Sequence, residues 1–500
     1  MLEHCRFRRA CPLAAVCALA MSQTALAAAF EDYEAVQAEL GRIAAGSAAR
    51  IEAIAKTSQG REVLLLTLSN DQSKADARPA LLITAGLDGR HTVGVETAVR
   101  VARNIIQKHA DVHNDVTIYV IACANPDGFD RNLGTVNYGH IGNLRPVNDD
   151  RDNATDEDGP ADLNGDGVIT MLRRVDPPLD DTATHLADPV EPRLLKKADK
   201  EKGERAIYSV YVEGLDADGD GLVAEDGVGF VDLDRNFMHR WPEHDLNAGV
   251  IPLSEPEAAA IAKFVIDHRN IVEAVTFGRH DNLINVPDGK GKDASGEGPK
   301  DLDEGDVGYY KEVSKLFKEL TGQERAPKEE TAGSFHAWLY AQRGIPNFAT
   351  VVWGRPEASK PPEEKKDEGA ASQPAGDATT QADAGAAPKD GDDKKKSKKD
   401  EKPKPADEEA AEWLKYSDRD RGGAGFIEWK EFDHPTLGTV EIGGFVPGFQ
   451  MNPPVDQLDE LAEKQTAFIV AMIDKRPRLT IDGPTVKKLA SGLYEVRLGI

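Results

Sequence analysis

The sequence predicts an α/β protein with a mixed sheet that is covered by helices on both faces. Residues 80–85 and 116–122 are short apolar runs of the kind found in buried strands, and the amphipathic residues 95–109 lie between them. This strand–helix–strand order predicts a parallel pair of strands. A second round follows, with a helix at residues 255–268 and a strand at residues 272–278. Strands that are apolar throughout are buried on both faces, so we expect helices on each side of the sheet.

The remaining elements extend this arrangement. Apolar residues from Tyr33 to Ile43 recur at helical spacing, and two β-type runs, residues 50–55 and 61–69, are joined by Ser58-Gln59-Gly60. These patterns predict a helix followed by a hairpin. Farther along, the periodicity predicts helices at residues 307–320, 334–343 and 455–475, and strands at residues 347–353 and 440–445, while residues 409–416 mark where folded sequence resumes after a polar stretch.

Composition indicates how the chain is divided. Residues 140–230 are an aspartate- and glycine-rich insertion within a domain that spans residues 31–355. Residues 356–408 are mainly Lys, Glu, Asp, Ala and Pro, which cannot bury enough apolar surface to fold, so they predict a disordered loop. We expect residues 409–476 to complete the same domain. Residues 477–500 alternate like paired strands and predict the beginning of a small β-domain.

The first 27 residues have the pattern of a signal peptide. Three arginines between residues 6 and 9 precede an apolar run at residues 11–21, which is too short to cross a bilayer, and Ala25-Leu26-Ala27 supplies a small-x-small cleavage site. A buried N-terminal helix is the alternative interpretation. Cleavage near Ala27 predicts export to the periplasm or the extracellular space.

Cysteine usage and charge exclude several classes of protein. Three of the four cysteines lie in the expected leader, so Cys123 is left alone, no intrachain disulfide is expected, and its apolar strand predicts a buried thiol. The formal net charge of -26 argues against nucleic-acid binding, which requires a basic face. No later segment has about 18 consecutive apolar residues, so no transmembrane segment is expected in the mature chain.

Four segments, in this order, resemble motifs of the carboxypeptidase A-type zinc peptidases. They are residues 57–63 (TSQGREV), 125–129 (NPDGF), 231–237 (VDLDRNF) and 333–340 (GSFHAWLY), the last followed by GIP at residues 344–346. The resemblance runs from about residue 31 to residue 353 and resumes at His434. It implies the eight-stranded mixed sheet of that family and a zinc-dependent enzyme that releases the C-terminal residue of a peptide.

The resemblance also implies where zinc is held. In that family, a His-x-x-Glu pair after the first parallel strand and a histidine at the end of a later strand bind the metal. Here Asp88 stands at the histidine position and His91 at the glutamate position, while the third position is Gly278, with His280 two residues beyond it. Because carboxylates and imidazoles both bind zinc, the resemblance implies a rearranged site of Asp88, His91 and His280.

The position of the general base is altered as well. Val351 stands at or beside the family's glutamate, and an aliphatic side chain cannot accept a proton. Asp281 and Glu441 are the candidate replacements. An ordinary structural carboxylate on a strand is the alternative interpretation of Glu441.

Three arginines resemble the family's substrate contacts. Arg235 matches the arginine that binds the C-terminal carboxylate of the peptide, although Asp234 precedes it where the family usually has asparagine. Arg90 and one of Arg173 or Arg174 resemble further substrate-facing arginines. Salt-bridged surface arginines are the alternative interpretation in so acidic a protein.

Two acidic loops within the insertion predict calcium binding. Residues 162–167 and 216–221 repeat the spacing D-x-[DN]-x-D-G, in which alternate oxygen atoms converge on one cation. Neither loop has the glutamate at position twelve, and solvated acidic turns are the alternative interpretation. The candidate ligands are Asp162, Asn164 and Asp166 in the first loop and Asp216, Asp218 and Asp220 in the second.

Three functions are consistent with these observations. The altered positions favour an exported protein that binds a peptide or a protein C-terminus, with hydrolysis lost or reduced. An active metallocarboxypeptidase with a rearranged zinc site is the alternative. A structural or cell-surface protein that uses calcium loops for attachment is the third hypothesis.

Overall fold

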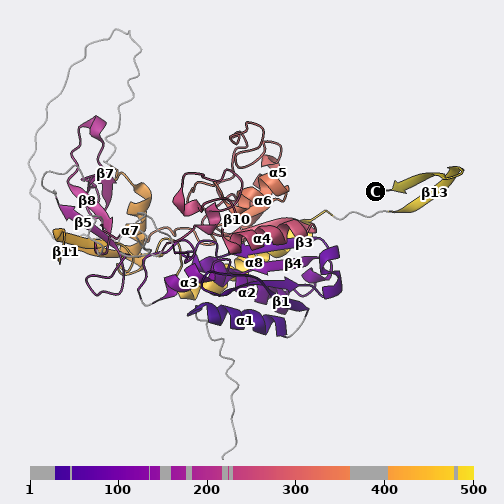
Figure 1. Ribbon diagram of the computed structural model, residues 1–500, viewed down its shortest axis with the longest axis horizontal. Coiled ribbons are helices and arrows are strands. Elements are labelled where there is room, and N and C mark those ends of the chain that lie inside the picture. The colour runs from indigo at the N-terminus through magenta and orange to yellow at the C-terminus, as the bar shows by residue number, and fades with distance from the viewer. Residues whose placement is uncertain are drawn as a thin grey trace, which may run out of the picture.

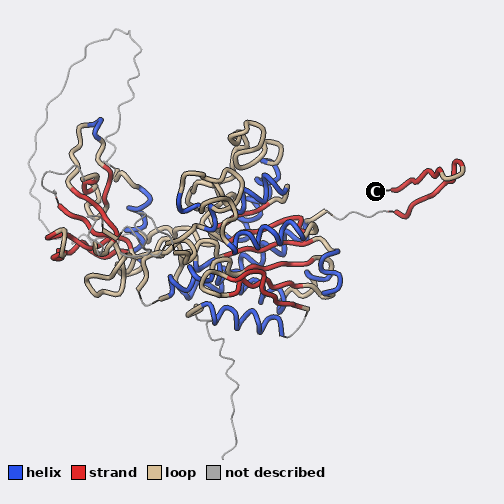
Figure 2. The backbone as a smooth tube through the Cα atoms, in the orientation of Figure 1, coloured by secondary structure: helices blue, strands red, loops and turns tan. Residues whose placement is uncertain are grey.

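The computed structural model describes residues 29–45, 48–134, 136–146, 159–175, 183–216, 223–224, 229–360, 404–477 and 482–499. It confirms the α/β class, and it contains a mixed sheet, a second sheet beside it and a separate hairpin (Figures 1 and 2). The expected signal peptide at residues 1–27 lies outside the described residues, as do residues 361–403 of the expected disordered loop. No helix within the described ranges combines the length and the apolar character needed to cross a membrane.

The first sheet has six strands where the sequence predicted eight. Its order is β1-β2-β4-β3-β9-β10, and the pairs β3/β4, β3/β9 and β9/β10 are parallel whereas β1/β2 and β2/β4 are antiparallel. The expected hairpin, βαβ unit and later strands are therefore all present. The strands are β1 (Ala49–Lys56), β2 (Glu62–Leu68), β3 (Ala80–Ala85), β4 (Thr117–Ile121), β9 (Ile271–Phe277) and β10 (Asn347–Thr350).

Helices cover both faces of this sheet, as predicted. Alternate strand residues point to opposite faces, so Leu81 and Ile83 of β3 join one apolar core and Leu82 joins the other. The first core is covered by α1 (Tyr33–Ala45), α2 (Thr92–Lys108), α5 (Val307–Thr321) and α8 (Leu458–Lys475), and the second by α4 (Pro256–Asp267) and α6 (Phe335–Arg343). The helix α3 (Pro126–Leu133) follows β4 and is capped by Asn125.

The second sheet joins two distant parts of the sequence. Its order is β11-β12-β5-β8-β6-β7, so strands of the insertion pair with strands that follow residue 404. The strand at residues 440–445 therefore belongs to this sheet and does not extend the first one (Figure 1). The elements are β5 (Met171–Val175), β6 (His185–Ala187), β7 (Leu195–Lys197), β8 (Tyr208–Val212), β11 (Phe426–His434), β12 (Gly438–Phe445) and the helix α7 (Glu408–Asp420).

Shorter elements complete the chain. The hairpin of β13 (Asp482–Ala490) and β14 (Leu493–Gly499) matches the expected paired strands, and its residues Val486, Leu489 and Val496 are more than half exposed. The 3-10 helices are η1 (Gln72–Ala77), η2 (Val112–Asn114), η3 (Lys200–Lys202), η4 (Leu233–Arg235), η5 (Leu246–Ala248) and η6 (Val455–Gln457).

Arg173 holds four strands of the second sheet together. Its guanidinium carbon lies 4.5 Å from the ring centroid of Tyr208 and 4.2 Å from that of Trp429. Its Nε donates to Oε2 of Glu441, which lies opposite on β12, at 2.7 Å. The side chain is therefore a cation held between two aromatic rings and one carboxylate, with contacts to β8, β11 and β12.

Replacing Arg173 should weaken the second sheet. Arg173→Met removes a desolvated cation from two aromatic faces, so we expect the free energy of unfolding to fall by about 2 kcal/mol in urea titrations. Arg174→Met, on the same strand but less buried, is the matched control and should change it by less than about 0.5 kcal/mol. Equal effects of the two changes would contradict this role for Arg173.

Glu257 is a buried carboxyl group in the first turn of α4. Its side chain is fully buried. Burial, with a further contribution from the charge of Glu255, raises the pKa of Glu257 to about 7. The folded protein therefore retains a proton on Glu257 at pH values where the unfolded chain has released it.

Stability should consequently fall as the pH rises from about 4.5 to about 7. In this window the unfolded state binds fewer protons than the folded state, so each pH unit costs about 1.4 kcal/mol at most. Glu257→Gln should remove this part of the decline, so that the variant is more stable than the parent at pH 8 and equally stable at pH 4. A variant that is less stable at both pH values would show that the carboxyl group has another role.

Candidate functional site

The candidate site lies where parallel strands of the first sheet end. Asp88 and His91 follow β3, and His280 and Asp281 follow its neighbour β9. Val351 follows β10, the next strand. The carboxyl ends of adjacent parallel strands form a common edge, where ligands bind in open α/β sheets. The topology therefore gathers at one edge the segments that the sequence singled out.

Asp88 is buried and engaged by two arginines. Its Oδ1 accepts from the backbone N–H of Arg90 at 2.9 Å and from Nε of Arg90 at 3.0 Å, and its Oδ2 lies 2.8 Å from Nη2 of Arg90. Nη1 of Arg279 lies 3.5 Å from the same Oδ2. Burial opposes ionisation, but the charges of Arg90 and Arg279 and the hydrogen bonds of Arg90 outweigh it and lower the pKa of Asp88 to about 2.

Arg279 connects three segments through its guanidinium group. Its Nη1 lies 2.7 Å from Oδ2 of Asp232, and its Nη2 donates to the backbone carbonyl oxygen of Asp234 at 3.3 Å. Its side chain is only 8% exposed. Burial acts to lower the pKa of Arg279, but the carboxylates of Asp232, Asp88 and Asp234 raise it above the ordinary value. A permanent positive charge is thus fixed among these acidic groups.

The turn that carries the acidic residues is ordered by its own hydrogen bonds. Asp232 caps η4 by accepting from the backbone N–H of Asp234 at 3.0 Å. Oδ1 of Asp234 accepts from the N–H of Phe335, the first residue of α6, at 2.9 Å. Burial raises the pKa of Asp234 to about 7. These hydrogen bonds hold the turn in place, so Arg235, the last residue of η4, is fixed beside the site.

The two histidines contact different groups. Nε2 of His91 lies 3.1 Å from the carbonyl oxygen of Val351, and its Nδ1 has no hydrogen-bond partner among the described residues. Nε2 of His280 lies 3.4 Å from Oδ2 of Asp234, and its ring centroid is 4.9 Å from that of His336. Burial lowers the pKa of both His91 and His280, so both imidazoles are neutral at physiological pH.

These residues do not fit a zinc ion. The described part of the chain contains no group of three or more His, Cys, Asp or Glu side chains that could hold a metal. Asp88 directs its oxygen atoms at two guanidinium groups, and a divalent cation beside Arg279 would be repelled by its charge. The third expected position, Gly278, has no side chain to contribute. The set of Asp88, His91 and His280 that the resemblance implied is therefore not assembled as a ligand set.

The candidate bases occupy separate places. Oδ1 of Asp281 accepts from the backbone N–H groups of Ile284 and Asn285, both at 2.8 Å, and burial raises the pKa of Asp281 to about 6. Glu441 lies in the second sheet and pairs with Arg173. This contact gives both Arg173 and Glu441 a structural role in the second sheet, and the catalytic and substrate roles suggested for them remain sequence predictions only.

Of the three predicted substrate arginines, Arg235 and Arg90 are partly exposed, whereas Arg173 is buried in the second sheet. The side chain of Arg235 is 33% exposed, and its Nη2 lies 2.8 Å from Oδ2 of Asp245. Arg90 is turned onto Asp88. A half-exposed guanidinium retains planar donors that suit a carboxylate.

Calcium binding by the two acidic loops stays a prediction. Asp162 accepts from three backbone N–H groups of its own loop, those of Gly165, Asp166 and Gly167. Asn164 accepts from the N–H of Asp166. In the second loop Asp216 is described, but Asp218 and Asp220 lie outside the described residues.

Sequence reasoning missed Arg279 and Asp232 as members of the site. Arg279 lies between Gly278 and His280, directly after an apolar strand, where a charged residue requires a buried partner. Asp232 lies two residues before Asp234 in the VDLDRNF segment. An arginine directly after an apolar strand predicts that a carboxylate lies beside it. The sequence does not show which carboxylate this is, because Asp88 and Asp232 are distant from Arg279 in the sequence.

Three of the solved structures that resemble this chain illustrate the range of similarity. They are the carboxypeptidase A of Helicoverpa armigera (15% identity, TM-score 0.39, covering 64% of this chain and 64% of that chain), the bovine thrombin-activatable fibrinolysis inhibitor (12%, 0.37, 63% and 83%) and a metallo-carboxypeptidase of Burkholderia cenocepacia (11%, 0.33, 63% and 59%). The match thus spans less than two thirds of the insect protein. Among curated proteins, none matches the sequence.

One family model matches part of the chain. Residues 40–166 match the model described as zinc carboxypeptidase, a range that contains β3, α2 and the segment of Asp88 and His91. The matched residues are about a quarter of the 500 in the chain.

Proposed function

We propose that this protein binds peptides or proteins by their C-terminal carboxylate and has lost, or greatly reduced, hydrolysis. The observation that carries the proposal is the buried guanidinium of Arg279 between Asp88 and Asp232. It supplies a positive charge beside the family's first metal-binding position. A guanidinium group cannot activate a water molecule as a metal ion does, because it has no open coordination position.

The surroundings of Val351 support the same proposal. Its side chain cannot act as a base, and its carbonyl oxygen is engaged by His91. Asp281, the nearest carboxyl group in sequence to His280, directs Oδ1 at two backbone N–H groups of its own turn. Neither Val351 nor Asp281 is therefore assigned the role of the general base.

Arg235 is the proposed anchor for the ligand. One of its terminal nitrogen atoms pairs with Asp245, a partly exposed carboxylate, and exposed pairs of this kind contribute little stability. A peptide carboxylate can therefore compete for the guanidinium group at low cost. Peptides are the proposed ligands because the zinc carboxypeptidases act on peptides. Arg235 would recognise the terminal carboxylate of the peptide and not the side chain of its last residue.

An active metallocarboxypeptidase is the second candidate. The observation that favours it is the pair of buried ring nitrogen atoms, Nδ1 of His91 and Nδ1 of His280, that have no hydrogen-bond partner among the described residues. Unpaired buried nitrogen atoms are costly and could serve as metal ligands. Arg279 would have to leave Asp88 for such a site to form.

Two further proposals follow from the sequence. Export to the periplasm or the extracellular space rests on residues 1–27, and calcium binding rests on Asp162, Asn164 and Asp166 with their counterparts in the second loop. A calcium-containing external space suits both. Mass analysis of the mature N-terminus, and the melting temperature with and without EDTA, would test them.

Binding should depend on the free carboxylate and on Arg235. Peptides with varied last residues, each in a free-acid and an amidated form, should bind only as free acids in titration calorimetry. Arg235→Gln should weaken binding by about tenfold or more, because a charge-assisted hydrogen-bonded pair is lost. Arg343→Gln, an exposed arginine on α6, is the matched control and should leave the affinity unchanged.

Hydrolysis and metal content decide between the two candidates. Intact peptides after long incubation, in the presence of added zinc, support the binding protein. One equivalent of bound zinc together with release of C-terminal residues would overturn the proposal in favour of the enzyme.

Arg279 should be required for stability. Arg279→Met leaves two buried carboxylates without their shared cation, and breaking a buried pair in this way costs about 3–5 kcal/mol of unfolding free energy. Arg279→Lys keeps the charge but loses the planar donors, so it should cost less. Urea unfolding measures both, with Arg343→Met as the control. A variant Arg279→Met as stable as the parent would show that the carboxylates are not held by this cation.

A further inference from the structure

A loop beside the proposed anchor holds two adjacent apolar side chains out in water. Val250 and Ile251, which we call the exposed pair, follow η5 and are 73% and 60% exposed. Val250 is the most exposed large apolar residue among those that the structure describes. Single exposed apolar residues are common, but two β-branched neighbours at this exposure leave most of their apolar surface in contact with water. Burial of such surface drives association, so the exposed pair is a candidate contact for a ligand.

The loop is attached to the turn that carries Arg235. The side-chain amide nitrogen of Asn236, the residue after Arg235, donates to the carbonyl oxygen of Ala248 at 2.7 Å and to that of Ile251 at 3.2 Å. The backbone N–H of Leu253 donates to the carbonyl oxygen of Asn236 at 2.7 Å. The side chain of Asn236 is fully buried. The backbone of Ile251 therefore lies within hydrogen-bonding distance of the residue adjacent to the anchor.

Close packing defines the conformation of this loop. Gly249 has φ of 84°, and a Cβ atom there would lie 2.3 Å from Oγ of Ser254 and 2.7 Å from Nδ2 of Asn236. Leu253 has φ of 58°, a left-handed conformation that is unfavourable for a residue with a side chain, and it packs against the second apolar core. The loop thus presents the exposed pair on a defined backbone. A preorganised surface loses little conformational entropy when a ligand binds.

A peptide held at Arg235 is long enough to reach the exposed pair. Nη2 of Arg235 lies 2.8 Å from Oδ2 of Asp245, and Val250 is five positions after Asp245. Five residues span at most about 18 Å. The N–H of Ala248 donates to the carbonyl oxygen of Asp245 at 2.9 Å, so the loop is folded and the span is shorter. An extended hexapeptide is about 20 Å long, which covers this distance.

Charge around the loop limits the kind of ligand. Glu243 is exposed and Asp245 is partly exposed, and the chain as a whole has a formal net charge of -26. An anionic lipid surface or an acidic peptide segment would be repelled by these charges. An uncharged apolar segment is not repelled, and the single negative charge at its C-terminus is met by Arg235.

We propose that the exposed pair selects peptides with apolar side chains at the third and fourth residues from the C-terminus. The inference rests on the proposed function, because Arg235 must hold the terminal carboxylate. With the carboxylate fixed, an extended peptide lies across the loop, and its apolar side chains remove the exposed pair from water. Arg235 thus recognises that a chain ends, and the exposed pair determines which chain ends bind.

Two acetylated hexapeptides test this selectivity. They are Gly-Ser-Ile-Leu-Ser-Ala and Gly-Ser-Ser-Ser-Ser-Ala, each prepared as a free acid and as an amide. In titration calorimetry on the full chain, the free acid with isoleucine and leucine should bind about tenfold more tightly than the serine peptide. Ile251→Ser and Val250→Ser should each lower this ratio by about threefold or more and leave the affinity for the serine peptide unchanged. Both positions are exposed, so the variants should fold. Ile266→Ser, at a 44% exposed position of α4, is the matched control and should keep the ratio.

The possible outcomes separate this inference from the proposed function. Equal affinity of the two free acids, with neither amide bound, would overturn the selectivity and leave Arg235 as the anchor. A tenfold ratio that persists in both loop variants would reject the contact with the exposed pair. Binding of neither free acid would contradict the proposed function and this inference with it. Self-association of the peptide-free protein in sedimentation velocity, abolished by Ile251→Ser, would assign the exposed pair to a second copy and overturn the peptide contact.

Discussion

The ion pairs of the buried Arg279 guanidinium join the segments on which the candidate site depends. Arg279 follows β9, Asp88 follows β3 and Asp232 lies in the turn that leads to Arg235. Each carboxylate is nearly or fully removed from water, and a buried charge is tolerated only when it is paired. The three segments come from distant parts of the chain, so the pairing fixes their relative positions at the edge of the sheet. The position of the proposed anchor Arg235 follows from it.

The same interaction bears on the proposed loss of hydrolysis. A zinc ion and a guanidinium group both neutralise carboxylates, so either can stabilise the loops that surround them. Only the metal polarises a carbonyl group or lowers the pKa of water. Under the proposed function, Arg279 stabilises the strand ends in place of a metal ion and does not supply the means of hydrolysis. Asp88 and Gly278 both stand where the zinc carboxypeptidases have histidine. Both fit a site built around Arg279, because a guanidinium group pairs with carboxylates and not with imidazoles.

The sequence predicted the first sheet well because its signals are local. The βαβ unit, the hairpin and the later helices follow from periodicity in segments of about 5 to 17 residues. The second sheet was not predicted, because β5 and β12 pair across more than 260 residues and each is short, as the contact of Arg173 with Glu441 shows. The sequence identified the segments of the site but not the ion pairs within it. Asp88, His91 and His280 were singled out, whereas Arg279, which pairs with Asp88, was not. Pairwise charge contacts between distant segments leave no periodic trace in a sequence.

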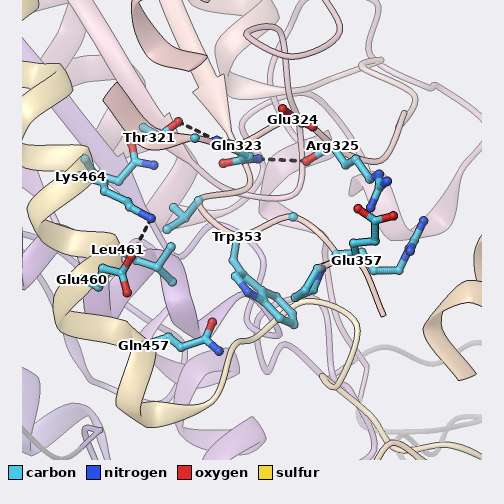
Figure 3. A pocket seen from close by; sticks show the side chains of 16 residues that line it. Thr321, Gln323, Glu324, Arg325, Trp353, Glu357, Gln457, Glu460, Leu461 and Lys464 are labelled. Carbon is cyan, nitrogen blue, oxygen red and sulfur yellow. Dashed lines mark hydrogen bonds and ion pairs between the residues drawn. The ribbon is translucent and has the colours of Figure 1, made fainter. Parts of the chain in front are cut away.

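The strained turn that follows β10 lies between the candidate site and a pocket beside α8 (Figure 3). The carbonyl oxygen of Val351 accepts from His91 and from the N–H of Trp353. The next residue, Val352, has a left-handed backbone and lines the pocket beside α8. A glutamate acting as a base at Val351 would need its side chain directed at the metal position. Here Val351 stands at that place, and the turn contacts a buried imidazole on one side and a pocket on the other. The turn after β10 therefore places Val351 at the candidate site and Val352 at the wall of the pocket.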